Sequence, residues 1–291
     1  MKRVLVLGGG GFLGSHVCKE LIKKKYIVTV FQRSNLINKT SNIKFKSIDL
    51  TNKEQCLKYI KNFDYVINCA AILNSKNQKK NFLDNFKSFF YPYISCIKNN
   101  IKNYIFISSN NAVSDKFFIK KNKANKTYQI KNGYTLAKIF SEYCGMELSK
   151  KNKVIFKVIR PSNIYGPGQS SGAIFYILKK LKNFNKKVLS LNINPNSVRN
   201  YTYVNDCARC IVQLLKIKKN ITCNITNDKK ISMRNIVDCY AKILDKKIFV
   251  KYSKKKKISK KIFNITNLNK YIKWNDKYDI FQGIKEFSSH I

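Results

Sequence analysis

The chain has 291 residues, 44% of them hydrophobic, and 58 Lys and Arg residues against 15 Asp and Glu residues give it a formal net charge of +43. This length and hydrophobic content predict one large α/β domain, or a domain with a smaller companion, and they exclude a disordered chain. No apolar run reaches the ~20 residues that a membrane span needs. The charge alone favours nucleic acid or an anionic membrane surface as a partner, but the lysines are spread over the whole chain beside many other residues with A/T-rich codons, so we predict no specific nucleic-acid partner.

The first element in the chain is a short apolar strand, 4–7, which ends in glycines. Four apolar residues are too few for a signal peptide, so we predict a buried strand and a cytoplasmic protein. Further strands are predicted at 26–31, 43–48, 65–69, 104–108 and 154–159, with helices at 12–25, 52–62, 80–99 and 134–150 between them. Strands that alternate with helices predict an α/β fold with a doubly wound, mainly parallel sheet.

The periodicity becomes less regular after Pro161. We therefore predict a dinucleotide-binding domain over 1–166 and a smaller substrate-binding region over 167–291. A helix at about 204–218 is expected to return to the first domain.

Nine cysteines are scattered along the chain, and Cys207 and Cys210 form a C-x-x-C pair. No second pair lies at the spacing of zinc ligands. We therefore predict reduced, mostly buried thiols and no metal site.

A glycine-rich turn, Gly8-Gly9-Gly10-Gly11-Phe12-Leu13-Gly14, joins the first strand to the first helix. Glycine allows the backbone to approach a pyrophosphate closely, and the N-terminus of the helix offers free N–H groups to the phosphates. The turn predicts a Rossmann-type dinucleotide site that includes Gly8, Gly11, Phe12, Leu13 and Gly14. Its G-x-x-G-x-x-G spacing resembles the short-chain dehydrogenase/reductase family.

Gln32 and Arg33 follow the second strand, where an NAD enzyme usually has an acidic residue for the ribose hydroxyls. The missing carboxylate and the added Arg33 would tolerate a 2′-phosphate, which favours NADP, although Gln32 can still bind a ribose. The cofactor is therefore predicted to be NAD or NADP. The family resemblance places these further residues around it: Asp49, Leu50, Cys69, Ala70, Ala71 and Pro161.

Tyr134 and Lys138 form a Y-x-x-x-K pattern at the start of the helix after the fifth strand, where this family carries its catalytic pair. Residues four apart share a helix face, so the phenol and the ammonium are expected in one site. A positive charge near a phenol favours the phenolate and lowers its pKa from ~10. We predict that Tyr134 is a general acid and base, and that both residues also contact the cofactor.

The family's third catalytic residue is a Ser or Thr just after the fifth strand. One alignment of this segment places Asn110 at that position, and another places Ser109 there. We favour Ser109, but Asn110 could also donate a hydrogen bond to a carbonyl oxygen. Ser114-Asp115 replaces the family's usual Tyr-Gly.

Two later motifs are similar to those of the extended branch of this family, the nucleotide-sugar epimerases, dehydratases and reductases. They are Arg160-Pro161-Ser162-Asn163-Ile164-Tyr165-Gly166-Pro167-Gly168 and Arg199-Asn200-Tyr201-Thr202-Tyr203-Val204-Asn205-Asp206. The resemblance implies that Asn163 and Arg199 bind the substrate, with the guanidinium of Arg199 on a diphosphate. It also implies a homodimer formed through the helices at 80–99 and 134–150.

The resemblance implies an NAD(P)-dependent nucleotide-sugar epimerase that acts through a transient keto-sugar. A reductase of a 4-keto nucleotide sugar would use the same residues. A dehydratase is less favoured, because Asn111-Ala112 stands where dehydratases carry Asp-Glu. The departures around Asn110 leave open a catalytically retired dinucleotide-binding protein.

Overall fold

The computed structural model describes residues 1–34, 42–73, 75–114, 119–121, 128–130, 132–184, 188–227, 229–245, 247–253, 260–261 and 268–291. The chain divides into two compact units. The first contains Met1–Arg160 and Ala208–Cys223, and the second contains Pro161–Cys207 and Asn224–Ile291. Within these described ranges, no helix has the length and apolar character needed to cross a membrane.

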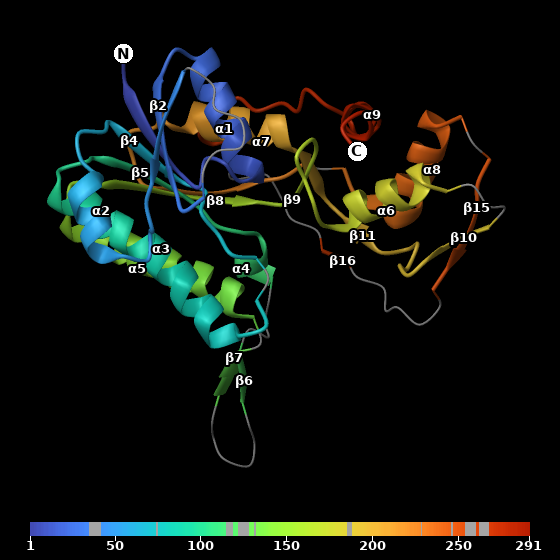
Figure 1. The fold of residues 1–291 in the computed structure, drawn as a ribbon, viewed down its shortest axis with the longest axis horizontal. Helices are drawn as coiled ribbons and strands as arrows, with labels where there is room; N and C mark the ends of the chain where they lie inside the picture. Colours follow the sequence, from blue (N-terminus) through green and yellow to red (C-terminus); the bar gives the residue numbers. More distant parts are fainter. Residues whose placement is uncertain are drawn as a thin grey trace. The chain divides into compact units, whose positions relative to one another are not determined.

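A seven-stranded sheet forms the centre of the first unit (Figure 1). Its order is β3 (Ile43–Ser47), β2 (Ile27–Gln32), β1 (Arg3–Leu7), β4 (Tyr65–Asn68), β5 (Asn103–Ile107), β8 (Ile155–Pro161) and β13 (Ile221–Ile225). The pairs from β3 to β8 are parallel, with Val4 opposite Val28 on one side and Tyr65 on the other. The chain order reverses beside β1, which confirms the predicted doubly wound sheet.

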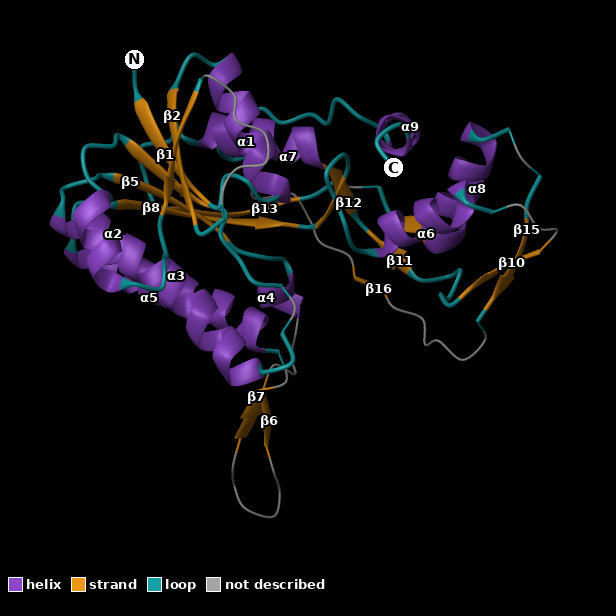
Figure 2. Cartoon of the chain, in the orientation of Figure 1, coloured by secondary structure: helices purple, strands orange, loops and turns teal. Residues whose placement is uncertain are grey.

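Helices cover both faces of this sheet (Figure 2). One face carries α2 (Lys53–Tyr59), α3 (Gln78–Lys98) and α5 (Gly133–Lys151), and the other carries α1 (Phe12–Lys23) and α7 (Val204–Leu214). α3 packs against both α2 and α5. A short α4 (Asn111–Ser114) and the antiparallel strands β6 (Ile119–Lys121) and β7 (Tyr128–Ile130) lie between β5 and α5 in the chain.

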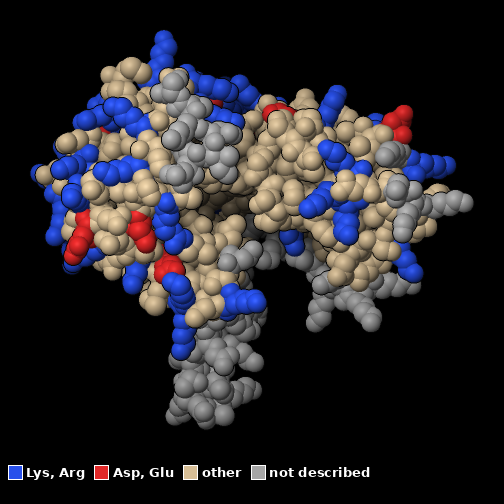
Figure 3. All heavy atoms as spheres, viewed as in Figure 1, with Lys and Arg blue, Asp and Glu red and all other residues tan. Residues whose placement is uncertain are grey.

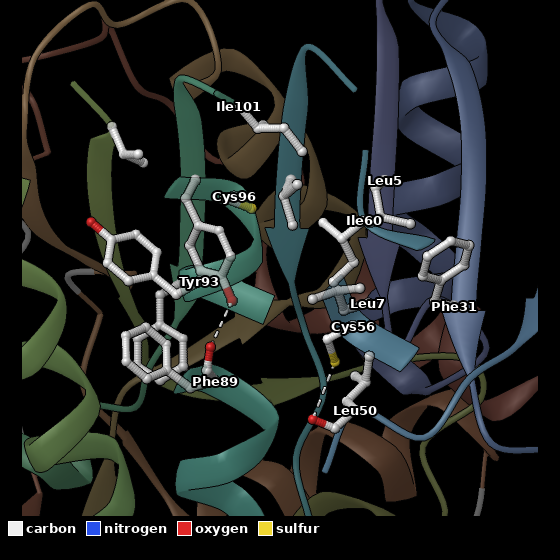
Figure 4. Close-up of a cluster of buried hydrophobic side chains, with 14 of the residues drawn as sticks. Leu5, Leu7, Phe31, Leu50, Cys56, Ile60, Phe89, Tyr93, Cys96 and Ile101 are labelled. Carbon is white, nitrogen blue, oxygen red and sulfur yellow. Dashed lines mark hydrogen bonds between the residues drawn. The ribbon is translucent and has the colours of Figure 1, made fainter. Parts of the chain in front are cut away.

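The core of the first unit is rich in aromatic rings (Figure 4). Phe89 and Tyr93 of α3 lie with ring centroids 5.5 Å apart and face Tyr104, Phe106 and Phe156 of the sheet. All nine cysteines are free thiols, buried or half-buried. The described residues bring together no group of three His, Cys, Asp or Glu side chains that could hold a metal.

The second unit has a small core of its own. Its helix α6 (Ala173–Lys182) buries Ile174, Ile177, Leu178 and Leu181, which share one helix face. The other elements are β9 (Asn163–Tyr165), β10 (Val188–Leu191), β11 (Val198–Arg199), β12 (Tyr201–Tyr203), β14 (Ile231–Ser232), α8 (Met233–Ile243), β15 (Phe249–Tyr252), β16 (Lys260–Lys261) and α9 (Ile280–Ser288). The strands form three small sheets: β9–β12, β10–β15 and β14–β11–β16.

Lysine and arginine side chains are distributed over most of the surface drawn in Figure 3, with few acidic residues among them. This agrees with the even spread of lysines along the sequence. Lys138 and Lys157 are buried instead. Lys157 of β8 is 0% exposed and donates from Nζ to the backbone oxygen of Leu215, after α7, at 3.2 Å.

Burial lowers the pKa of Lys157 from 10.5 to about 8, so the stability of the protein should depend on this proton. Between these two pH values the unfolded chain binds the proton and the folded chain does not, so stability rises with pH. We expect the free energy of unfolding of the wild type, relative to Lys157→Met, to increase by about 2 kcal/mol from pH 7 to pH 9.5. Urea unfolding of both proteins measures this change. If the difference in the free energy of unfolding between wild type and variant did not change with pH, the lowered pKa of Lys157 would be contradicted.

Candidate active site

The glycine turn forms one wall of a cavity of about 300 Å³ in the first unit. Gly8 has a φ of +73°, and a Cβ added there would lie 2.9 Å from the Cα of Ala70. A Cβ on Gly14 would lie 2.2 Å from the backbone oxygen of Gly8, so the helix can approach the turn only without a side chain there. The turn therefore has the close packing that a dinucleotide site requires.

Nine of the residues predicted to bind the cofactor line this cavity. They are Gly8, Gly11, Gln32, Arg33, Asp49, Leu50, Cys69, Ala70 and Ala71. Phe12, Leu13 and Gly14 belong to the first turn of α1 behind the glycine loop, and Pro161 is the last residue of β8. The predicted residues of the turn and of three strand ends thus meet around one space.

Gln32 is fixed by two hydrogen bonds at this cavity. Its Oε1 accepts from the N–H of Gly10 at 2.6 Å, and its Nε2 donates to the backbone oxygen of Ser34 at 2.8 Å. The carboxylate of Asp49 accepts from the N–H of Thr51 at 2.9 Å and from its hydroxyl at 2.8 Å. The end of the cavity at β2 therefore carries the neutral amide of Gln32, with Arg33 also in the lining.

Three asparagines fix the segment after β4 that lines the cavity; the sequence places Asn68 directly before this segment, but it gave no role to Asn81 and Asn85. Asn68 accepts from the N–H of Ala70 at 3.0 Å. Asn85 accepts from the N–H of Ile72 at 2.9 Å, and both Asn81 and Asn85 donate to the Ile72 oxygen at 3.0 Å. Asn81 and Asn85 are buried on α3. Their spacing of four residues places them on one helix face, and this spacing could have indicated from the sequence that they act together.

Tyr134, Lys138 and Ser109 come together at the end of β5. Lys138 Nζ lies 5.6 Å from the centroid of the Tyr134 ring and donates to the backbone oxygen of Ile107 at 2.6 Å. The Ser109 side chain hydrogen-bonds the Tyr134 phenol. Asn110, the residue after Ser109, is also buried. Asp115 lies outside the described residues.

The pKa of Tyr134 differs from the sequence-based expectation. Burial raises it to about 12, and the hydrogen bond from Ser109 opposes this rise only in part. Burial also lowers the pKa of Lys138 to about 8, while Cys69 and Glu142 oppose that change. The predicted lowering of the Tyr134 pKa is therefore wrong, because the loss of water on burial outweighs the opposing hydrogen bond with Ser109.

Cys69 lies between Lys138 and the cavity. It lines the cavity and interacts electrostatically with Lys138. Lys138 therefore lies close to one residue of the cavity lining, although neither Tyr134 nor Lys138 is itself among the lining residues.

Asn163 and Arg199 lie near each other in the second unit. Asn163 Nδ2 donates at 3.0 Å to the backbone oxygen of Asn200, the residue after Arg199. The Nε of Arg199 is buried and has no hydrogen-bond partner among the residues that the structure describes. A buried donor of this kind is costly unless a ligand or water satisfies it.

The model of one protein family matches residues 4–226, and its description is the NAD dependent epimerase/dehydratase family. The chain belongs to this family. Membership confirms the resemblance to the extended branch of the short-chain dehydrogenases/reductases and the prediction of an NAD(P)-dependent enzyme.

Relatives in the epimerase/dehydratase family match most of the chain. The uncharacterized UDP-glucose epimerase YtcB of Bacillus subtilis (strain 168) is 24% identical over 281 residues, which cover 87% of this chain and 85% of that protein. The GDP-mannose 3,5-epimerase of Arabidopsis thaliana is 21% identical over 275 residues, which cover 84% and 70%.

Solved structures show the same epimerase fold. UDP-N-acetylglucosamine 4-epimerase from Methanobrevibacter ruminantium M1, in complex with UDP-N-acetylmuramic acid, has a TM-score of 0.85 at 23% identity and covers 99% of this chain and 97% of that one. UDP-glucose 4-epimerase of Thermus thermophilus, in complex with NAD, has a TM-score of 0.81 at 21% identity and covers 99% and 98%.

Proposed function

We propose that this protein is a nucleotide-sugar epimerase that oxidises a sugar hydroxyl to a transient ketone and reduces it again from the other face. The observation that carries the proposal is the contact of Tyr134 with Ser109 beside Lys138, which lies close to Cys69 in the lining of the cavity at the glycine turn. The epimerases among the relatives and the solved structures support the same reaction class.

Each residue of the catalytic group has a separate task in this proposal. A nicotinamide in the cavity supplies the acceptor and donor of the hydride and, when oxidised, a positive charge. Tyr134 takes the proton of the sugar hydroxyl and later returns it, which requires its phenol to lose its own proton first. Lys138 favours that loss through its charge, and Ser109 holds the reacting oxygen by a hydrogen bond.

The substrate diphosphate is proposed to bind Arg199. Its buried Nε has no partner among the described residues, and a guanidinium fork pairs well with phosphate oxygens. Asn163, beside it, would bind a neighbouring polar group of the substrate.

The deciding experiment begins with the cofactor that the purified protein retains. The protein is denatured and any released nicotinamide is identified; fresh protein is then incubated with UDP-, dTDP- and GDP-sugars without added cofactor. Retained cofactor and conversion of a sugar to its epimer would support the proposal. Turnover only with added NADPH and a keto-sugar would instead indicate a reductase, and no turnover in either assay would indicate a retired binding protein.

We also propose a preference for NADP over NAD. The neutral amide of Gln32 does not repel a 2′-phosphate, and Arg33 of the same cavity adds a positive charge. Gln32→Asp should weaken NADPH binding by at least about tenfold relative to NADH, because two negative charges would face each other. Fluorescence titration measures both affinities. Tighter NADH binding by the wild type would contradict this preference.

A homodimer through α3 and α5 is the proposed assembly. These helices pack together and expose Leu83, Phe140 and Tyr143, of which Tyr143 is 67% exposed. Large exposed apolar side chains on adjacent helices are typical of a subunit interface. Light scattering should give twice the chain mass of 33.9 kDa, and Phe140→Glu with Tyr143→Glu should give the monomer. A monomeric wild type at micromolar concentration would rule out this dimer.

A further inference from the structure

A buried carboxylate lies one helical turn beyond Lys138 on α5. Glu142 is only 3% exposed and accepts hydrogen bonds from two other elements. Arg160 of β8 donates from Nε to Oε1 at 2.9 Å and to Oε2 at 3.1 Å, and its terminal nitrogen also donates to Oε2. The hydroxyl of Ser108, directly after β5, donates to Oε1. These bonds supply the partners that a buried carboxylate needs.

The same stretch of β5 carries the residue proposed to hold the reacting oxygen. Ser108 bonds Glu142 and is followed at once by Ser109, while Lys138 donates to the preceding Ile107. Two side chains of α5, four residues apart, thus attach the helix to two successive residues of the strand end. A change at this attachment would move the Ser109 hydroxyl relative to the tyrosine that it contacts.

Glu142 also acts on the charge of Lys138, because its carboxylate opposes the effect of burial on the lysine pKa. The other titratable groups that face Lys138 are Tyr134 from α5 and Cys69 from the segment after β4. Arg160 of β8 acts through its pairing with Glu142. Strand β5 contributes an aromatic ring and a backbone oxygen. Glu142 is therefore the acidic group of α5 whose negative charge opposes the effect of burial on the Lys138 pKa.

We propose that Glu142 is a positioning residue, whose carboxylate fixes Ser109 against Tyr134 through the Ser108 hydroxyl and places a negative charge one helical turn from Lys138. The inference rests on the proposed function for the tasks of those three residues. A buried ion pair with a structural role alone can be replaced by uncharged residues of similar size with little loss. A positioning carboxylate cannot, because its loss also removes a negative charge one helical turn from Lys138 and the acceptor of the Ser108 hydroxyl.

The double variant Glu142→Gln with Arg160→Met separates these two roles. It removes both charges, leaves no unpaired guanidinium, and keeps an amide oxygen for the Ser108 hydroxyl. The charge of Lys138 is measured in the cofactor-free protein, as the pH dependence of its acetylation read by peptide mass spectrometry. We expect a midpoint near pH 8 in the wild type and at least about half a pH unit lower in the double variant.

Glu147→Gln is the matched control, because it removes a carboxylate from the exposed face of the same helix, where it pairs with Lys150. Its acetylation midpoint for Lys138 should equal that of the wild type. A folded double variant with the wild-type midpoint would overturn the inference. This readout needs no turnover, so it remains decisive even if no sugar nucleotide is converted and the proposed function fails.

Ser108→Ala tests the positioning of Ser109 by itself. This variant keeps the ion pair of Glu142 and Arg160, so the Lys138 midpoint should not move. If an epimerase reaction is found, kcat should fall at least about tenfold with little change in KM, because the affected contact acts on the reacting oxygen. If Ser108→Ala has the wild-type kcat across the pH range, Glu142 does not position Ser109. This test does not require the double variant to fold.

Discussion

Tyr134→Phe should reduce the rate of sugar conversion by about 10²–10⁴-fold, because the variant loses the group that moves the proton. The ring remains, and the phenol hydroxyl that is removed bonds the Ser109 side chain, so the fold and cofactor binding should persist. The measurement combines NMR detection of the epimerised sugar with identification of the cofactor released on denaturation. A variant that keeps its cofactor and loses its rate would locate the defect in the chemistry.

Tyr26→Phe is the matched control for this experiment. Tyr26 lies directly before β2, at the amino ends of the parallel strands, whereas the candidate catalytic group lies at the carboxyl end of β5; it packs edge-on against Tyr65. The same change of one hydroxyl should leave the rate unaltered there. If Tyr134→Phe kept more than about a tenth of the wild-type rate, general acid–base catalysis by this tyrosine would be refuted.

The first unit could be predicted from the sequence because its signals are local. Val4–Leu7 is a continuous apolar run that ends in glycine, and the apolar residues of the following helix recur at helical spacing. Each such element is long enough to carry its own pattern. In the second unit, β11 and β14 have two residues each, so no alternation can be read from them. Helix α6 could have been found, since its four buried residues recur at helical spacing.

The candidate site shows the same limit at the level of single residues. Tyr134 and Lys138 share a helix turn, so their spacing in sequence predicted their proximity. The ion pair of Glu142 with Arg160 joins residues 18 apart in sequence on different elements, so no local sequence pattern predicts it. The pKa of Tyr134 was expected to fall because the sequence shows the lysine. The burial that raises it arises from the folded structure.

Gly14→Ala should damage both the fold and the cofactor site. The added Cβ would lie 2.2 Å from the backbone oxygen of Gly8 and 2.9 Å from the Cα of Gly9, so the turn itself must move. Overpacking of this kind costs about 1–3 kcal/mol of stability. A displaced turn would also lose the backbone hydrogen bonds that we propose for the pyrophosphate, so we expect cofactor affinity to fall at least about 100-fold. Urea unfolding and fluorescence titration measure the two effects.

Gly11→Ala separates the packing of the turn from its approach to the cofactor. Gly11 has an extended backbone with φ −73° and ψ 171°, and a Cβ there would lie 3.3 Å from the oxygen of Gly8. The free energy of unfolding should therefore stay within about 1 kcal/mol of the wild type. Cofactor affinity should still fall, because the methyl group would occupy the space that the pyrophosphate needs. Wild-type affinity in both variants would mean that the cofactor does not bind at this turn. If both variants lose affinity but only Gly14→Ala loses stability, Gly14 is needed for the packing of the turn and Gly11 for the approach of the cofactor.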